Sequence, residues 1–180
     1  MYPIINYPYS SKLNDRLYDT IIQNLSPEEA ENDTSVGRRT VWDLHKQNIR
    51  DVDLLTTWIK NIVSTKHVLI PLNNESAEDY EDSFNFNSHD FKMTHCWGLI
   101  YDKGQSMTVH NHFPFTLSFV YGVRMPRGSA PLILGNKKIN LKEGQCVFFL
   151  SHTMHRVPSH NRSERRCVVA GNLLYELKDM

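Results

Sequence analysis

Three histidines and one arginine have the types and the spacing of a metal site with an anion clamp. His110 and His112 are separated by one residue, His155 lies 43 positions beyond His112, and Arg166 follows. Successive side chains of a strand point to opposite faces, so the imidazoles of His110 and His112 share one side. Imidazole binds zinc, copper, iron and nickel, and two histidines plus a third ligand form the facial arrangement of non-heme iron sites. The spacing predicts a mononuclear metal site inside a β-barrel.

The predicted ligand set contains no carboxylate. No Asp or Glu occurs from Lys103 to Lys142, and His112 stands where a two-histidine, one-carboxylate site has its acid. Three neutral imidazoles leave the metal charge uncompensated, which favours an anionic chelating ligand, unless Glu143, Glu164 or the N-terminal half supplies an acid. His152 is a fallback ligand, although we interpret it as a surface turn residue.

Arg166 fits the expected need for a cation beside an anionic ligand. A guanidinium that points into a barrel binds a carboxylate through two parallel hydrogen bonds. In the alternative interpretation, Arg162, Arg165 and Arg166 form a solvated basic patch. Strand alternation places four residues on one face: Arg166, Val168, Ala170 and Asn172.

The remaining histidines and the cysteines are interpreted as structural. The histidines without a partner at ligand spacing are His45, His67, His89, His95 and His160. Cys96, Cys146 and Cys167 are odd in number and form no C-x-x-C pair, which predicts reduced thiols. We assign no catalytic role to any of them.

Length and charge limit the classes of protein to consider. The 180 residues predict a single domain, and 20 Lys and Arg balance 20 Asp and Glu. Without a basic excess we expect no bulk binding of nucleic acid. No apolar run has the length of a membrane span, and the N-terminus lacks the pattern of a signal peptide. We therefore expect a soluble, cytoplasmic protein that does not bind membranes.

The first 72 residues are predicted to form a helical flank with the first strands. Helices are expected over 11–25 and 52–65, with Asp51 as the cap of the second. Ser26 to Glu29 has the signature of a further helix start, and 67–72 is a short strand. The buried stripe predicted for the second helix consists of Leu54, Leu55, Trp58, Ile59 and Ile62.

The rest of the chain divides into a polar segment and a run of strands. Residues 73–92 are acidic and are interpreted as a mobile lid or a solvated surface loop. Residues 93–180 are predicted to be the β core. Short strands at this spacing indicate a sandwich or a barrel. The predicted strands are 95–102, 107–113, 116–125, 130–135, 138–141, 145–150 and 165–175.

Motifs in the second half resemble the 2-oxoglutarate- and iron(II)-dependent oxygenases, in particular a bacterial and phage branch similar to prolyl hydroxylases. The order of the motifs carries the resemblance, since each piece alone is weak. They are Trp97-Gly98-Leu-Ile-Tyr101, Gly104, His110-Asn111-His112-Phe113-Pro114, Leu117-Ser118-Phe119-Val120-Tyr121, Gly144-Gln-Cys-Val-Phe-Phe149, His155-Arg156-Val157-Pro158 and Arg166-Cys-Val-Val-Ala-Gly-Asn172.

The resemblance implies a mainly β fold, a double-stranded β-helix or jelly roll covered by N-terminal helices. It also implies hydroxylation with iron(II), 2-oxoglutarate and O2 at the barrel mouth. Carried over, His110, His112 and His155 would be the iron ligands, and Arg166 would bind the far carboxylate of 2-oxoglutarate. The remaining implied cofactor-binding residues are Ser118, Tyr121 and Asn172. Most of the superfamily has an acid where this chain has its second histidine.

Two alternatives remain open at the level of the sequence. The chain is also similar to the cupins, jelly-roll metalloenzymes that need no 2-oxoglutarate, through Gly104, the two first histidines and Gly144. Arg166 and Asn172 lie outside the cupin motifs, which favours the oxygenase. A non-catalytic binding or structural jelly roll, of viral type, is the third hypothesis. The sequence does not separate a small-molecule from a peptidyl substrate, and a homodimer stays open.

Overall fold

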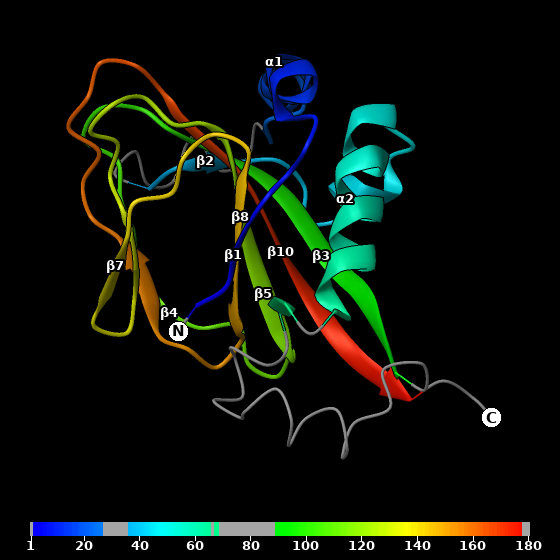
Figure 1. Ribbon diagram of the computed structural model, residues 1–180. Coiled ribbons are helices and arrows are strands. Elements are labelled where there is room, and N and C mark those ends of the chain that lie inside the picture. Colours follow the sequence, from blue (N-terminus) through cyan, green and yellow to red (C-terminus); the bar gives the residue numbers. More distant parts are fainter. Residues whose placement is uncertain (1, 27–35, 66, 69–88, 178–180) are drawn as a thin grey trace.

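Two sheets of antiparallel strands face each other and form the framework of the molecule (Figure 1). The computed structural model describes residues 2–26, 36–65, 67–68 and 89–177. The larger sheet has six strands in the order β1-β8-β5-β10-β3-β2, and the smaller has four in the order β4-β9-β6-β7. Strands that follow each other in the chain often lie in different sheets, which is the arrangement of a jelly roll. The expected fold class is confirmed.

The bounds of the strands follow. The larger sheet contains β1 (Ile4–Asn6), β8 (Gln145–Leu150), β5 (Leu117–Arg124), β10 (Arg166–Leu177), β3 (His89–Tyr101) and β2 (Arg38–Arg39). The smaller sheet contains β4 (Met107–His110), β9 (His155–Val157), β6 (Leu132–Leu134) and β7 (Lys137–Ile139).

Side-chain alternation gives the larger sheet two apolar faces and the molecule two cores. On β8, Cys146 and Phe148 belong to the core on the helix side of the sheet. Val147 and Phe149 belong to the core between the two sheets. A strand that is buried on both faces is apolar throughout, which explains why the run Cys146–Leu150 shows no polar alternation.

Two helices cover the outer face of the larger sheet (Figure 1): α1 (Ser10–Gln23) and α2 (Arg50–Val63). A short 3-10 helix, η2 (Leu44–Lys46), precedes α2. Helix α1 buries Leu13, Leu17 and Ile21. Gly98 on β3 allows a close approach of α1, because a Cβ atom there would lie 2.5 Å from Cγ1 of Ile21. Among the described residues, no helix is long and apolar enough to cross a membrane.

The predicted helices and core strands lie close to their expected positions, with differences at the ends. Both helices begin and end up to two residues before their predicted bounds, and β8 has its predicted range. Asp51 is not the cap of α2, since the helix begins at Arg50 and Asp51 instead binds Arg16 at 2.8 Å. Three strands were not predicted: β1, β2 and β9. Each has only two or three residues, too few to show the alternation of polar and apolar residues that identifies a strand.

Other predictions of the N-terminal half were wrong or lie outside the described residues. His67 and Val68 are helical, not extended, and 69–72 are outside the described part. The predicted polar segment 73–92 ended too late, because 89–92 already belong to β3. The helix start predicted at Ser26 falls on residues 27–35, which are not described.

Candidate metal centre

Three imidazoles meet at one end of the space between the sheets. Strands β4 and β9 pair antiparallel, with His110 opposite His155. His112 lies two residues beyond His110, the last residue of β4. The ligating atoms of the three side chains all lie within 4.8 Å of one another. Their ring centroids are 4.2 Å (His110–His155), 5.1 Å (His110–His112) and 4.9 Å (His112–His155) apart. One ion can therefore contact all three rings, as the sequence predicted.

Two of the histidines are oriented by the same local hydrogen bond. Nδ1 of His110 is 2.8 Å from the carbonyl oxygen of Thr108, and Nδ1 of His155 is 2.9 Å from that of Thr153. A carbonyl only accepts, so each Nδ1 carries the proton and donates it. This bond fixes the tautomer and leaves Nε2 of each ring with its lone pair free for a metal.

His112 is held differently from the other two. Its ring lies against the indole of Trp97, with 5.6 Å between the centroids. Its backbone N–H donates to the carbonyl of Ser151 at 2.7 Å, and its own carbonyl accepts from the N–H of Phe115 at 3.0 Å. Backbone bonds and ring packing fix this ligand, whereas a bond to the ring itself fixes each of its partners.

Burial lowers the pKa of His112 and of His155 and so favours the neutral imidazole, which is the form that binds a metal. Burial, with a smaller effect of His155 and His110, lowers the pKa of His112 to about 3. Burial also lowers the pKa of His155 to about 4 against the opposing bond to Thr153. A neutral ring at ordinary pH offers its lone pair without first losing a proton.

A column of paired residues leads from the histidines into the barrel. Along β10 and β3 the inward-facing pairs are Asn172 with His95, Ala170 with Trp97, Val168 with Leu99, and Arg166 with Tyr101. A narrow cavity of about 50 Å³ runs along this column and is lined by the three histidines at one end and by Arg166 at the other. Ala170 and Arg166 are four positions apart, which corresponds to about 13 Å of strand.

Arg166 is the one long basic side chain at the inner end of this cavity. It is 1% exposed, and its guanidinium lies 4.7 Å from the centroid of the Tyr101 ring. Nε donates to the carbonyl of Ala130 at 3.1 Å, but neither Nη atom has a hydrogen-bond partner among the described residues. Burial lowers the pKa of Arg166. Two unbonded buried donors of a guanidinium are costly, so the side chain fits a bidentate anion.

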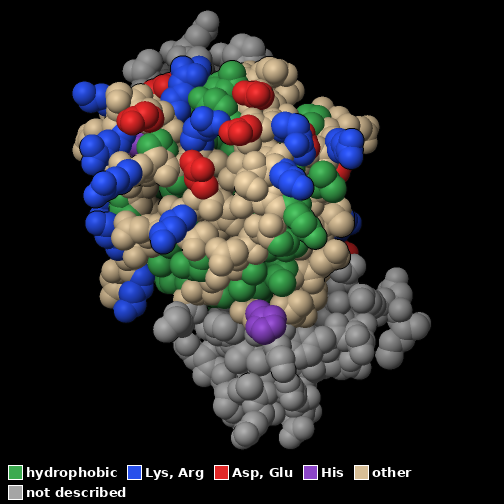
Figure 2. Space-filling model, turned by 45° about the horizontal axis from the view of Figure 1, so that its top comes forward, with side chains coloured by type: hydrophobic (Ala, Val, Ile, Leu, Met, Phe, Trp, Pro, Cys, Tyr) green, Lys and Arg blue, Asp and Glu red, His purple; other side chains and the backbone are tan. Residues whose placement is uncertain are grey.

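The neighbouring arginine shows that the predicted strand register is right. Arg165 is exposed and donates to Asp102 at 2.8 Å, and Asp102 also accepts from Arg38. Arg166 points the opposite way into the barrel. The alternative of a solvated basic patch is therefore wrong for Arg166, although Figure 2 shows that other Lys and Arg side chains gather along one side of the surface.

The donor set fits a divalent metal with an anionic co-ligand. Three neutral imidazoles suit iron and other divalent transition metals and bring no negative charge. The two unbonded Nη atoms of Arg166, at the far end of a slender cavity, match the second carboxylate of an extended dicarboxylate. Glu143 cannot complete the metal site, because its carboxylate accepts the N–H of Met125. His152 is exposed and lies outside the group, as interpreted from the sequence.

The three expected cofactor-binding residues do not line this cavity. Ser118 and Asn172 lie on the inner face but bond to each other at 2.8 Å. Tyr121 points the other way, into the core on the helix side, and donates to Asn14 at 2.6 Å. Strand alternation explains the difference, because Tyr121 is an odd number of residues from Ser118. The structure does not bring Tyr121 to the site.

Sequence reasoning assigned no role to two residues at the centre, Tyr101 and Ser151. Tyr101 is the strand partner of Arg166, and burial raises its pKa to about 12, with Arg166 opposing the rise. Its spacing of four from Trp97 places both on one face and could have identified it. Ser151 lies in a turn, where periodicity gives no such signal.

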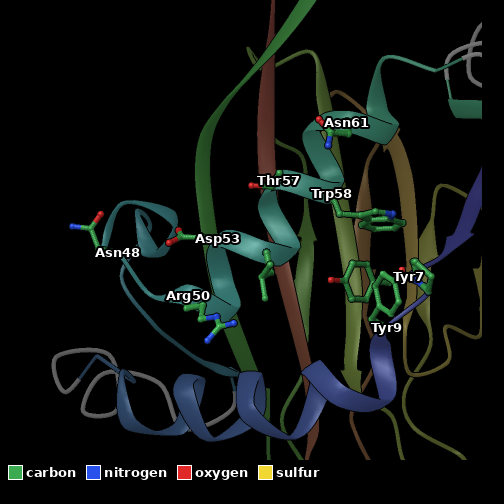
Figure 3. Close-up of a pocket in the computed structure, with 10 residues that line it drawn as sticks. Tyr7, Tyr9, Asn48, Arg50, Asp53, Thr57, Trp58 and Asn61 are labelled. Carbon is green, nitrogen blue, oxygen red and sulfur yellow. The ribbon is translucent and has the colours of Figure 1, made fainter.

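A wider groove lies away from the histidines, on the helix side of the larger sheet (Figure 3). It has a volume of about 470 Å³ and lies between α2 and the segment that joins β1 to α1. Leu54, predicted to be buried, is 44% exposed here. The face of α2 that lines the groove includes Thr57, Trp58 and Asn61. None of the residues of the metal centre takes part in it.

Solved structures with a similar fold include several prolyl hydroxylases. A viral collagen prolyl hydroxylase from Paramecium Bursaria Chlorella virus-1, in complex with 2OG, has a TM-score of 0.65 at 12% identity, covering 96% of this chain and 94% of that one. A Pseudomonas putida prolyl-4-hydroxylase has a TM-score of 0.63 at 14% identity, with 96% and 92% covered. A Trichoplax adhaerens prolyl hydroxylase has a TM-score of 0.62 at 14% identity, with 95% and 82% covered.

These similarities establish the fold of the chain along nearly its whole length. No family model matches the sequence, and no curated protein matches it. At such low identity the function must be argued from the residues of the site.

Proposed function

We propose that this protein is an iron(II)- and 2-oxoglutarate-dependent oxygenase that acts as a hydroxylase. The observation that carries the proposal is the pairing of a three-histidine group with a buried guanidinium, whose two Nη atoms have no partner among the described residues, at the two ends of one narrow cavity. The structural neighbours include prolyl hydroxylases and a 2OG complex, which supports this reaction class among the many that a jelly roll hosts.

In this proposal each residue has a stated task. His110 and His155 would hold the metal through Nε2 and His112 through one of its ring nitrogens, and the carbonyls of Thr108 and Thr153 orient two of the rings. Arg166 binds the distal carboxylate of 2-oxoglutarate, and the ring of Tyr101 supports the guanidinium. When bound, iron would activate O2, the oxidant, and 2-oxoglutarate would be the co-substrate that is oxidised with the substrate, while the protein positions these groups and excludes water.

The cupin-like alternative accounts for less of the structure. It explains the histidines but gives no task to Arg166, whose unbonded Nη atoms are buried at the end of the cavity. A purely structural jelly roll gives no reason for the ligating atoms of three histidines to lie within 4.8 Å of one another, nor for the two Nη atoms of Arg166 to be buried without a partner.

Replacement of single histidines tests the metal site. His110→Ala and His155→Ala should each abolish loading of iron(II) under anaerobic conditions, while His152→Ala, an exposed neighbour, should load as the wild type does. Bound metal is measured by elemental analysis after desalting. Full loading of both site variants would refute the assignment of these ligands.

A further inference from the structure

A buried chain of three polar side chains lies behind His112. Ser151 follows β8, Ser118 lies on β5 and Asn172 on β10; they are 0%, 1% and 3% exposed. Oγ of Ser118 is 2.8 Å from Oγ of Ser151 and 2.8 Å from Oδ1 of Asn172. We infer that this chain is a positioning network for the second metal ligand, His112. The inference rests on the metal site of the proposed function.

The need for such a network follows from how His112 is held. His110 and His155 lie on paired strands, and each ring donates to a carbonyl two residues earlier. His112 lies beyond the end of β4 and is held by hydrogen bonds of its backbone. Its N–H donates to the carbonyl of Ser151 at 2.7 Å, and this bond ties the ligand to the turn after β8.

The hydrogen bonds of the network have one direction. The hydroxyl of Ser118 has one proton and donates it to Oδ1 of Asn172. It must then accept the proton of Ser151, so the chain runs from Ser151 through Ser118 to Asn172. Each member depends on the next, and removal of one leaves a buried polar partner unsatisfied.

The same residues connect the ligand to the rigid part of the fold. Ser118 and Asn172 are opposite each other in the ladder of β5 and β10 at the centre of the larger sheet. The backbone N–H of Ser151 donates to Thr116, and Thr116 in turn donates to Leu173 of β10. His112 is thus anchored to the larger sheet, whereas His110 and His155 belong to the smaller one. The network therefore fixes the position of His112 on the larger sheet relative to His110 and His155 on the smaller sheet.

The network also explains why Ser118 and Asn172 looked like cofactor-binding residues in the sequence. Their positions face the barrel, but the hydroxyl of Ser118 and Oδ1 of Asn172 are already bonded within the chain. A residue that contacts 2-oxoglutarate and a residue that positions His112 give different results on substitution, which makes the two roles separable.

The test uses Ser118→Ala, Ser151→Ala and Asn172→Ala in the full chain. Each should weaken the binding of iron(II), measured anaerobically by calorimetry, by about tenfold, the effect typical of groups that orient a ligand. With Co(II) as a spectroscopic probe, the visible ligand-field bands should shift, because the position of His112 changes. Thr94→Val is the matched control. The hydroxyl of Thr94 donates to the backbone carbonyl of Asn172 and takes no part in the hydrogen bonds between the three side chains. Loss of this hydroxyl should leave the iron(II) affinity and the Co(II) spectrum unchanged.

Three results would overturn the inference. The first is unchanged iron affinity and an unchanged Co(II) spectrum in any folded variant of the three. The second is a loss of 2-oxoglutarate binding with normal metal binding in Ser118→Ala or Asn172→Ala, which would return these residues to the co-substrate. The third is an equal effect of Thr94→Val. If one variant does not fold, the other two break the same chain at different links. Wild-type protein that binds metal but not 2-oxoglutarate would refute the proposed function and leave this inference standing.

Discussion

The two faces of the larger sheet differ in what they bury. The face toward α1 and α2 buries a nearly continuous apolar core, in which Asn14 is the rare polar residue and is satisfied by Tyr121 and by backbone carbonyls. The face toward the smaller sheet buries an arginine with two unbonded nitrogens, a histidine with a lowered pKa, and the network around Ser118. One face of the sheet is thus almost wholly apolar, whereas the other combines an apolar core with the polar groups that cost stability and that the proposed function uses.

The largest effect should come from the almost wholly apolar face. Leu17→Ala removes a fully buried side chain from the contact of α1 with the sheet. We expect the free energy of unfolding to fall by about 2–5 kcal/mol, the range for such truncations. Denaturant unfolding measures this change. The affinity for iron(II) of the folded fraction should not change, and a tenfold loss would show that the faces are coupled.

The second prediction concerns Arg166, which should have opposite effects on binding and on stability. In Arg166→Met, binding of 2-oxoglutarate should weaken by about 2–5 kcal/mol, since the clamp of a carboxylate is lost. The ligand-free protein should be as stable as the wild type or more stable, because a buried unpaired charge is replaced by an apolar side chain. Arg165→Met is the exposed control. A variant that binds 2-oxoglutarate normally would place the clamp elsewhere.

The third prediction is a pH dependence of the metal-free protein. The pKa values of His112 and His155 lie near 3 and 4 in the folded state, below the ordinary value of 6.5. The unfolded chain therefore binds more protons below pH 6.5, and stability present above that pH is lost as the pH falls toward 4. The loss is at most about 1.4 kcal/mol per pH unit for each histidine.

Thermal unfolding at pH 6.5 and at pH 5 measures this effect without metal. The double variant His112→Asn/His155→Asn should show a smaller drop between the two pH values than the wild type. Equal drops would mean that these imidazoles are not held neutral by the fold.

The smallest effect should come from Tyr121, the residue that the resemblance placed at the co-substrate. Tyr121→Phe removes the hydrogen bond to Asn14 in the apolar core and should cost about 0.5–1.5 kcal/mol of stability. Binding of 2-oxoglutarate, measured by calorimetry, should equal that of the wild type. Weakened binding would contradict the assignment of Tyr121 to the almost wholly apolar face.

The sequence predicted those parts that depend on regular local patterns. The 3.6-residue period is carried by Leu13, Leu17 and Ile21 in α1 and by Leu55 and Ile59 in α2. The shared face of the His-x-His pair and the inward direction of Arg166 follow from strand alternation. The groups that escaped prediction depend on pairing between distant segments. Ser151 meets Ser118 across 33 residues, and although its spacing from Trp97 gives the face on which Tyr101 lies, its pairing with Arg166 depends on the register of two distant strands.

The same limit explains the wrong expectations. The apolar stripe of α2 is wider than the part of the helix that contacts the sheet. Leu54 belongs to this stripe but lines the open groove, so the periodicity predicts more burial for Leu54 than the structure shows. Tyr121 and Ser118 belong to the same motif of the resemblance. They are an odd number of positions apart on β5, so their side chains lie on opposite faces of the sheet. Register decides such cases, and register is set by the whole sheet.

The most direct measurement is an anaerobic titration with iron(II) followed by 2-oxoglutarate, observed by visible absorption. The three-histidine site with its arginine predicts a metal-to-ligand charge-transfer band that appears only when both are present. Arg166→Met should shift the titration to much higher 2-oxoglutarate concentration. Metal binding without any band would contradict the oxygenase and favour a cupin-like enzyme, and a protein that binds no metal would leave the three histidines without the role assigned to them.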